Sequence, residues 1–178
     1  MQEAIFGGGC FWCLEAIFEQ LHGVKSVISG YSGGKNINPS YEAVCSGQTG
    51  HAEVVKIVFE PGVISYRQLL EVFFGIHDPT TLNRQGADVG SQYRSVIFAL
   101  DAEQFSEARE FIAHLNTDNA FEKPVVTELS ELKEFYPAET YHQGYFRNNP
   151  SQGYCSVVVS PKVQMSRKKF PSLIKLSD

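Results

Sequence analysis

The stretch EAIFGGGCFWCLEAIFEQL, Glu3 to Leu21, joins a strand pattern to a helix pattern through three glycines. EAIFG is typical of a short strand that ends at Gly7–Gly9, where the backbone is free to turn sharply. Apolar residues then recur at near-helical spacing, so a helix is predicted over 10–21: they are Phe11, Leu14, Phe18 and Leu21. Cys10 therefore lies where a strand ends and a helix begins.

Residue patterns in the rest of the chain predict further helices, strands and loops. Ser65 and Asp101 are predicted to cap helices over 66–77 and 102–115, and segments 33–50 and 78–92 read as long loops of the kind that are often functional. Further strands are predicted over 23–32, 51–62, 93–100, 124–129 and 153–159, and a short helix over 138–146. The order strand, helix, strand, strand, helix, strand predicts an α+β fold: a two-layer sandwich with a ferredoxin-like split β-α-β core and additional C-terminal helix and strand elements.

Length and composition indicate one globular domain. The 178 residues, 43% of them hydrophobic, predict a single domain over 1–178, with a core of about 4–162 and a tail of about 163–178. The basic cluster Arg167–Lys169 reads as part of a solvated tail, and with a net charge of −5 no nucleic-acid partner is expected. No apolar run is long enough for a membrane helix, and the first residues do not resemble a signal peptide. Four cysteines are too few for a disulfide scaffold, so a reducing compartment, the cytoplasm, is predicted. No obvious association stripe is present, so a monomer is predicted.

Cys10 is the first candidate for chemistry. A helix N-terminus carries partial positive charge, which favours the reactive thiolate, although a free cysteine is also commonly a small buried hydrophobe. Cys13 lies one helical turn further on, so the pair could close to a disulfide or share a metal. Structural zinc usually takes four ligands, and Cys45 and His51 are irregularly spaced for that purpose, so no metal is predicted.

Several other side chains are candidates with competing structural explanations. Phe11 and Trp12 are either core residues or an apolar wall for a substrate. His51 and Glu53 fall on the same face of a predicted strand; if Glu53 turns inward among apolar residues, burial would make it a general acid. The loop ends add Tyr41, Asp88 and Tyr93, which are candidate polar partners or packing residues, and His142, which reads as a surface or capping histidine.

Taken together, the ordered motifs resemble those of the A-type peptide methionine sulfoxide reductases. They run from about Ala4 to Lys162: GCFWCLEAIF, GYSGG, NPSYEAVCSGQTGHAEVV, HDPTT, DVGSQYRS and YHQGYF. The resemblance implies reduction of methionine S-sulfoxide, free or in proteins, to methionine, in a repair role. It implies that no cofactor is bound and that thioredoxin supplies the electrons.

The resemblance also implies roles for individual residues. Cys10 matches the nucleophile, and Phe11 and Trp12 match the pocket for the substrate's methyl group. Glu53 matches the acid that protonates the sulfoxide oxygen, which requires a desolvated carboxyl group. Its polar companions are matched by Tyr41, Asp88 and Tyr93.

The cysteine pattern departs from many members of that family. They carry glycine at the position of Cys13 and take a resolving cysteine from a glycine-rich C-terminal tail. The resemblance implies that reduction leaves Cys10 as a sulfenic acid, with which a second thiol condenses to a disulfide that thioredoxin reduces. We expect Cys13 to be this resolving thiol and Cys155 to be the alternative, with Cys45 a bystander. Two other functions stay open on sequence alone: a thioredoxin-like disulfide oxidoreductase, and a small metal-binding or peptide-binding module.

Overall fold

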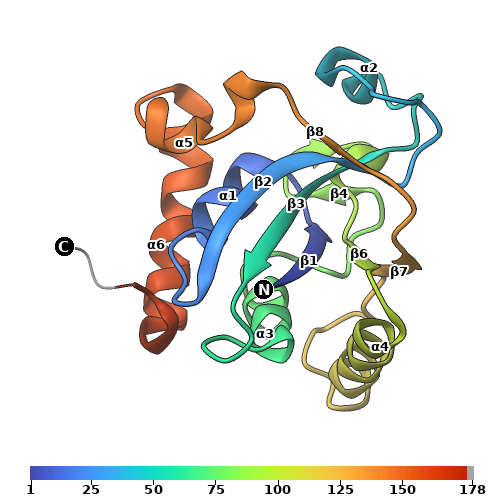
Figure 1. Cartoon of the computed structure of the whole chain (residues 1–178), viewed down its shortest axis with the longest axis vertical. Coiled ribbons are helices and arrows are strands. Elements are labelled where there is room, and N and C mark those ends of the chain that lie inside the picture. Colours follow the sequence, from blue (N-terminus) through green and yellow to red (C-terminus); the bar gives the residue numbers. More distant parts are fainter. Residues whose placement is uncertain (176–178) are drawn as a thin grey trace.

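The computed structural model describes residues 1–175 and is organised around one six-stranded sheet (Figure 1). The strand order is β7-β6-β1-β3-β2-β8. The strands are β1 (Gln2–Gly7), β2 (Val24–Ser32), β3 (Ala52–Phe59), β6 (Val96–Ala99), β7 (Glu128–Glu131) and β8 (Phe135–Pro137), while β4 (Arg84–Gln85) and β5 (Asp88–Val89) pair separately.

The sheet is mixed. β1 pairs antiparallel with both β3 and β6, β3 pairs antiparallel with β2, and β7 joins β6 in parallel. The helices are α1 (Phe11–Phe18), α2 (Tyr41–Cys45), α3 (Tyr66–Ile76), α4 (Ala102–Thr117), α5 (Tyr145–Asn148) and α6 (Ser160–Lys169). The predicted α+β class is therefore confirmed.

The main core lies between the sheet and helices α1, α3 and α6. Phe6 of β1 stacks on Phe73 of α3, with ring centroids 4.8 Å apart, and contacts Phe18 of α1. A smaller cluster on the other face of the sheet includes Val54 and Phe98. Because both faces of the central strands are covered, β1 and β3 are buried almost throughout.

The turn between β1 and α1 depends on its glycines. Gly9 has φ +98°, a conformation that side chains with a Cβ rarely adopt. A Cβ at Gly7 would lie 2.8 Å from the carbonyl oxygen of Glu53 on β3. The glycine run thus brings the start of α1 close against β3, and Cys10, in extended conformation, is the N-cap of the helix.

The predicted helix caps are confirmed. Ser65 and Gln68 form a capping box at α3, and the Asp101 side chain accepts the Gln104 N–H at α4. Other boundaries differ. The predicted loops contain α2 and the β4–β5 hairpin, the predicted strand over 124–129 forms at Glu128–Glu131, and β8 was not predicted.

The predicted strand over 153–159 is wrong, because this segment is helical. A π-helical turn over Cys155–Val159 runs directly into α6, which packs against α1 and α3. Buried positions recur four residues apart at 155, 159 and 163, whereas Val157 is 74% exposed. Burial of this helical stripe outweighs the strand preference of the three valines.

The C-terminal segment is also more ordered than a solvated tail. Arg167–Lys169 form the last turn of α6, where cations are favourable for the helix dipole. Pro171–Leu173 form a 3₁₀ turn, and Ile174 bridges to Leu21. The remaining residues of the predicted tail, 176–178, lie outside the described residues.

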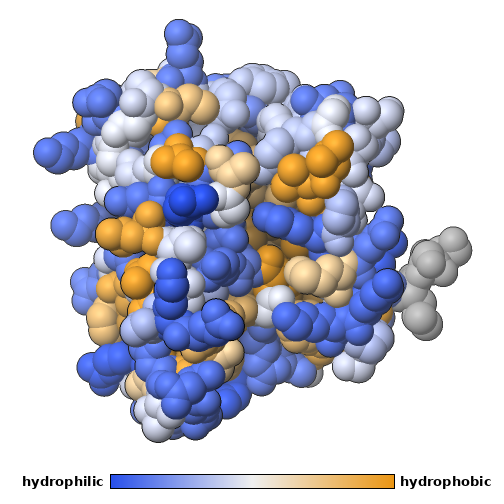
Figure 2. Space-filling view, turned by 180° about the vertical axis from the view of Figure 1, so that it is seen from behind, coloured by the Kyte–Doolittle hydropathy of each residue, from blue (hydrophilic) through white to orange (hydrophobic). Residues whose placement is uncertain are grey.

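The distribution of hydrophobic residues on the surface is relevant to the predicted monomeric state. On the rear face, hydrophobic residues lie in several separate patches among hydrophilic ones (Figure 2). Among residues 1–175, no helix is both long and apolar enough to span a bilayer. The monomeric state stays a prediction.

Candidate active site

The glycine turn places Cys10 beside a buried carboxyl group. Glu53 on β3 is 1% exposed, and its Oε1 accepts the backbone N–H of Phe11, the residue after Cys10, at 3.1 Å. Its Oε2 is buried with no hydrogen-bond partner among the described residues. Desolvation raises the pKa of Glu53 to about 8, so the carboxyl group is mostly protonated at neutral pH. The expectation that Glu53 is buried is confirmed.

The expectation of a thiolate at Cys10 is not confirmed. Burial, followed by the charge of nearby Glu53, raises the pKa of the thiol well above its ordinary value of 9.0. The Trp12 N–H at the helix start lowers this pKa, as the helix-terminus argument requires, but burial outweighs it. Since Glu53 is mostly neutral at pH 7, its charge acts on Cys10 mainly at higher pH.

Phe11 lies at the centre of an aromatic cluster. Its side chain is fully buried, and its ring lies 5.7 Å from that of Tyr31, 6.4 Å from that of Tyr41 and 5.1 Å from that of His142. Burial and then the charge of Glu53 raise the pKa of the Tyr41 hydroxyl, which keeps it protonated. The structure thus brings Tyr41 into the neighbourhood of Glu53 by way of α2, inside the predicted loop.

Trp12 is held by two residues of the YHQGYF motif. Its Nε1–H donates to Nδ1 of His142 at 3.0 Å, and its ring stacks on Tyr145 with centroids 3.8 Å apart and planes 7° from parallel. His142 is fully buried, so its prediction as a surface or capping histidine is wrong. Its Nε2 has no partner among the described residues, and burial lowers the pKa of the ring. Nothing in the sequence around His142 indicates that its ring is a buried acceptor for the Trp12 indole N–H.

The segment that carries His142 and Tyr145 is held in place by hydrogen bonds to two carboxyl groups, Glu15 and Glu139. Glu15 of α1, 3% exposed, accepts the Gly144 N–H at both oxygens, at 2.6 and 3.0 Å. Burial raises the pKa of Glu15 to about 7. Glu139 accepts the Tyr31 hydroxyl and the Tyr41 N–H, each at 2.9 Å. Sequence reasoning missed both acids, because burial distinguishes Glu15 and long-range hydrogen bonds distinguish the partly exposed Glu139.

Asp88 and Tyr93 reach the same region from the second long loop. The hydroxyl of Tyr154 donates to Oδ2 of Asp88 at 2.5 Å, and the Tyr154 ring lies edge-on to Trp12. Burial, the charge of Glu53 and weaker contributions from Asp88 and Cys10 raise the pKa of Tyr93. Tyr154 was not predicted; it follows the glycine at 153, and only the tertiary structure brings it to Trp12.

The four cysteines are all free. Cys13 is 3% exposed and Cys155 is fully buried, whereas Cys45 is exposed. Burial raises the pKa of Cys13 to about 11; smaller effects come from Cys155 and other groups, while Cys13 in turn raises that of Cys10. Cys13 is therefore near both the partly exposed Cys10 and the buried Cys155.

His51 does not join Glu53. It precedes β3, and its ring accepts the Gly34 N–H at 3.0 Å and contacts the Asn36 carbonyl oxygen at 2.7 Å, within the glycine-rich loop. In the described part of the chain, no three His, Cys, Asp or Glu residues are grouped so as to hold a metal ion.

Comparison with known proteins agrees with this architecture. The model of the peptide methionine sulfoxide reductase family matches residues 2–173. The chain is 56% identical over 174 residues to peptide methionine sulfoxide reductase MsrA of Polynucleobacter asymbioticus, covering 98% of this chain and 92% of that one. It is 56% identical over 169 residues to MsrA of Deinococcus radiodurans, covering 95% and 82%.

Solved structures give the same result. Reduced Mxr1 from Saccharomyces cerevisiae superposes with a TM-score of 0.81 at 34% identity, over 86% of this chain and 88% of that one. Methionine sulfoxide reductase A of Corynebacterium diphtheriae gives 0.81 and 34%, over 85% and 76%. The fold is therefore that of a methionine sulfoxide reductase, an oxidoreductase. The chain belongs to the peptide methionine sulfoxide reductase family, A type.

Proposed function

We propose that the chain reduces methionine S-sulfoxide, protein-bound and free, to methionine by way of a Cys10 sulfenic acid. The observation that carries this proposal is the protonated, buried Glu53, which accepts the N–H of Phe11, the residue after Cys10, and whose Oε2 has no partner among the described residues. Sulfoxide oxygen leaves poorly until it is protonated, and a carboxyl group with a pKa near 8 holds the required proton at neutral pH.

The proposed step is balanced within the site. The Cys10 sulfur attacks the sulfoxide sulfur and gives up its thiol proton, Glu53 donates a proton to the sulfoxide oxygen and takes one back from the thiol, and the oxygen passes to Cys10. Methionine leaves, and the Cys10 sulfur is oxidised by two electrons to sulfenic acid. We assign Tyr41, Tyr93 and Asp88 as polar companions of Glu53, and Phe11 and Trp12 as the methyl pocket, in which only Trp12 keeps exposed surface.

For the next step we assign Cys13 as the resolving thiol. It lies one turn from Cys10, and its backbone N–H donates to the Cys10 carbonyl oxygen at 3.1 Å. Because disulfide geometry is not automatic at this spacing, the first turn of α1 must adjust. Cys155 is the alternative resolver, and its helix would have to open to bring it to Cys10. With Cys13 as the resolving thiol, the chain would be a CxxC variant of the family.

The resulting disulfide requires an external dithiol. The same yeast Mxr1 has also been solved in complex with Trx2, a match of 24% identity and TM-score 0.57 to this chain. We therefore propose thioredoxin as the reductant, in a cytoplasmic role in protein repair. The strand order β6-β1-β3-β2, with its three antiparallel pairs, also supports classification of the core as ferredoxin-like and of the chain as one domain.

The test is a single turnover without reductant. One equivalent of methionine S-sulfoxide is added, and methionine and remaining thiols are counted for the wild type and for Cys10→Ser, Cys13→Ser and Cys155→Ser. We expect the wild type to form one methionine and lose two thiols, Cys10→Ser to do neither, and Cys13→Ser to form methionine but accumulate sulfenic acid.

The exposed cysteine provides a matched control for the three substitutions. Cys45→Ser, at the exposed cysteine, should behave as the wild type. A stall in Cys155→Ser instead of Cys13→Ser would move the resolver to Cys155 and leave the reaction intact. No methionine from any variant would refute the reductase function and favour the disulfide-exchange or binding-module alternatives.

A further inference from the structure

The turn before Cys10 has no side chains of its own to hold it in place. Gly7 ends β1, and only Gly8 and Gly9 separate it from Cys10. Because glycine leaves the backbone freer than any other residue, the position of this turn depends on what packs against it. On one side lies β3, since a Cβ at Gly7 would meet the Glu53 carbonyl oxygen at 2.8 Å.

On its other side the turn is supported by two buried side chains, those of His77 and Gln85. A Cβ at Gly8 would meet the His77 ring at 3.0 Å. A Cβ at Gly9 would meet Cγ of Gln85 at 2.8 Å and its Cβ at 3.0 Å. The aliphatic part of Gln85 therefore fills the space that a side chain at residue 9 would need.

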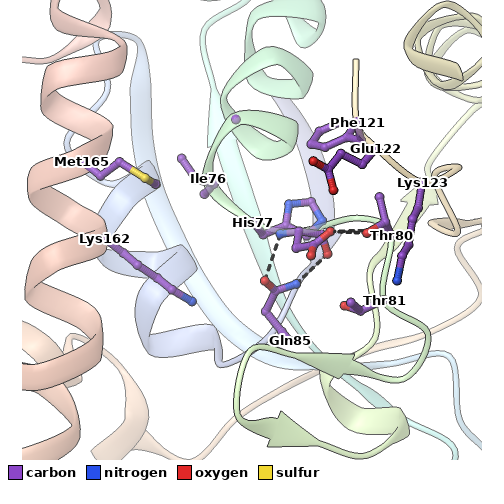
Figure 3. A pocket seen from close by; sticks show the side chains of 12 residues that line it. Ile76, His77, Thr80, Thr81, Gln85, Phe121, Glu122, Lys123, Lys162 and Met165 are labelled. Carbon is purple, nitrogen blue, oxygen red and sulfur yellow. Dashed lines mark hydrogen bonds between the residues drawn. The ribbon is translucent and has the colours of Figure 1, made fainter. Parts of the chain in front are cut away.

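Behind these two side chains lies a cavity rather than packed protein. His77 and Gln85 both line it, and it has a volume of about 600 Å³ between the end of α3, α6 and the loop that follows α3 (Figure 3). Packing from behind therefore contributes little to holding Gln85 against Gly9. The side chain needs an anchor of its own.

That anchor is a pair of hydrogen bonds to the backbone of Asp78. Oε1 of Gln85 accepts the Asp78 N–H at 2.9 Å, and Nε2 donates to the Asp78 carbonyl oxygen at 2.8 Å (Figure 3). Two bonds from one planar amide fix both its position and its orientation. Because β4 and β5 pair apart from the main sheet, the same amide attaches their hairpin to the loop that follows α3.

We propose that Gln85 is a positioning residue for the reduction step, whose anchored side chain holds the turn before Cys10 against β3. The Cys10 sulfur is thereby kept in line with the sulfoxide that Glu53 protonates. Among the described residues, the polar side-chain atoms of Gln85 bond only to Asp78, so its effect reaches Cys10 through the backbone of the turn. The inference rests on the proposed function, in which Cys10 is the nucleophile.

The test compares the wild type with Gln85→Met, which keeps an unbranched side chain of similar length but has no amide. Asp78 is exposed, so water can replace the two lost partners and the fold should persist. The methionine burst is followed over a range of methionine S-sulfoxide concentrations without reductant. Alkylation of Cys10 by iodoacetamide, without substrate, is followed by peptide mass spectrometry. Thr80→Val is the matched control, because Thr80 lines the same cavity and its hydroxyl bonds to the Asp78 side chain.

We expect the two measurements to move in opposite directions in Gln85→Met. A misplacement of about 1 Å can cost about 10²-fold in rate, so a partly loosened turn should slow the burst at saturating sulfoxide by about tenfold. The half-saturating concentration should stay unchanged, since the contacts of Trp12 are not altered. A loosened turn also exposes the sulfur, so alkylation of Cys10 should become several-fold faster. Thr80→Val should match the wild type in both measurements.

A second variant keeps the test decisive if Gln85→Met does not fold, as judged by urea unfolding followed by Trp12 fluorescence. Gln85→Glu keeps an acceptor for the Asp78 N–H and loses the donor to the Asp78 carbonyl oxygen. It should change both rates in the same directions as Gln85→Met, by a smaller factor.

Wild-type burst and alkylation rates in Gln85→Met would overturn the role of the anchor, as would an equal slowing of the burst in Thr80→Val. A change confined to the half-saturating concentration would assign Gln85 to substrate binding instead. A burst and an alkylation rate that fall together would assign it to the reactivity of the thiol. Each of these results overturns the inference and leaves the proposed function intact, whereas an absent burst in the wild type overturns the proposed function and the inference with it.

Discussion

Replacing Glu53 by glutamine removes the acidic proton and keeps the size of the side chain. The amide oxygen can still accept the Phe11 N–H, but the side chain no longer has a carboxyl proton to donate. Positioned proton transfer typically contributes about 10²–10⁴-fold in rate, so we expect the methionine burst at pH 7 to slow by that factor. In the wild type the burst should also decline as the pH rises through about 8, because the acid is then ionised.

Although Glu53→Gln should slow the reaction, it should make the stability of the fold less sensitive to high pH. The pKa of Glu53 is about 8 in the fold against an ordinary 4.5, and each pKa unit corresponds to about 1.4 kcal/mol, so ionising the buried carboxyl group costs roughly 4–5 kcal/mol. Because the folded pKa is raised, this contribution to stability is fully present below pH 4.5 and is lost progressively as the pH rises through 8. Glu53→Gln has no such loss.

Urea unfolding followed by the fluorescence of Trp12, the single tryptophan, measures this difference. The quantity of interest is the change in unfolding free energy of the wild type between pH 5.5 and 8.5, minus the same change in Glu53→Gln. That subtraction removes any constant cost of burying the new amide. We expect the wild type to lose several kcal/mol more over this range. A pH-independent difference, or a wild-type burst rate in Glu53→Gln, would refute the assignment of a buried general acid.

Three further predictions concern the surroundings of the site. His142→Phe removes the acceptor of the Trp12 indole N–H, so we expect urea unfolding to show a loss of about 1–3 kcal/mol together with a higher KM for the sulfoxide. Glu15→Gln, at a carboxyl group with a pKa of about 7, should reduce the loss of stability between pH 5 and 7.5; an unchanged slope would mean that Glu15 ionises freely. Gly8→Ala would press a Cβ to 3.0 Å from a buried imidazole, and displacement of the turn should lower kcat tenfold or more, whereas Gly62→Ala, in open space, should not.

The sequence predicted the elements whose signals are local. The glycine run, the helical spacing after Cys10 and the caps at Ser65 and Asp101 each depend on neighbours in the chain, and the structure agrees with them. It also predicted the burial of Glu53, because a carboxyl group stays protonated at neutral pH only when it is desolvated. Local chemistry and motif order were sufficient for the fold class and the family.

Three features depended on contacts between distant residues. Valines favour a strand, yet residues 155–159 are helical because the stripe through Cys155 packs on α1. His142 is buried against Trp12 in a segment that Glu15, 129 residues before Gly144, ties to α1. The pKa of the Cys10 thiol is raised, although its place at a helix start argues for a thiolate, because desolvation depends on everything packed around the sulfur. The sequence alone determined which groups are available for chemistry, whereas tertiary packing decided their protonation and their partners.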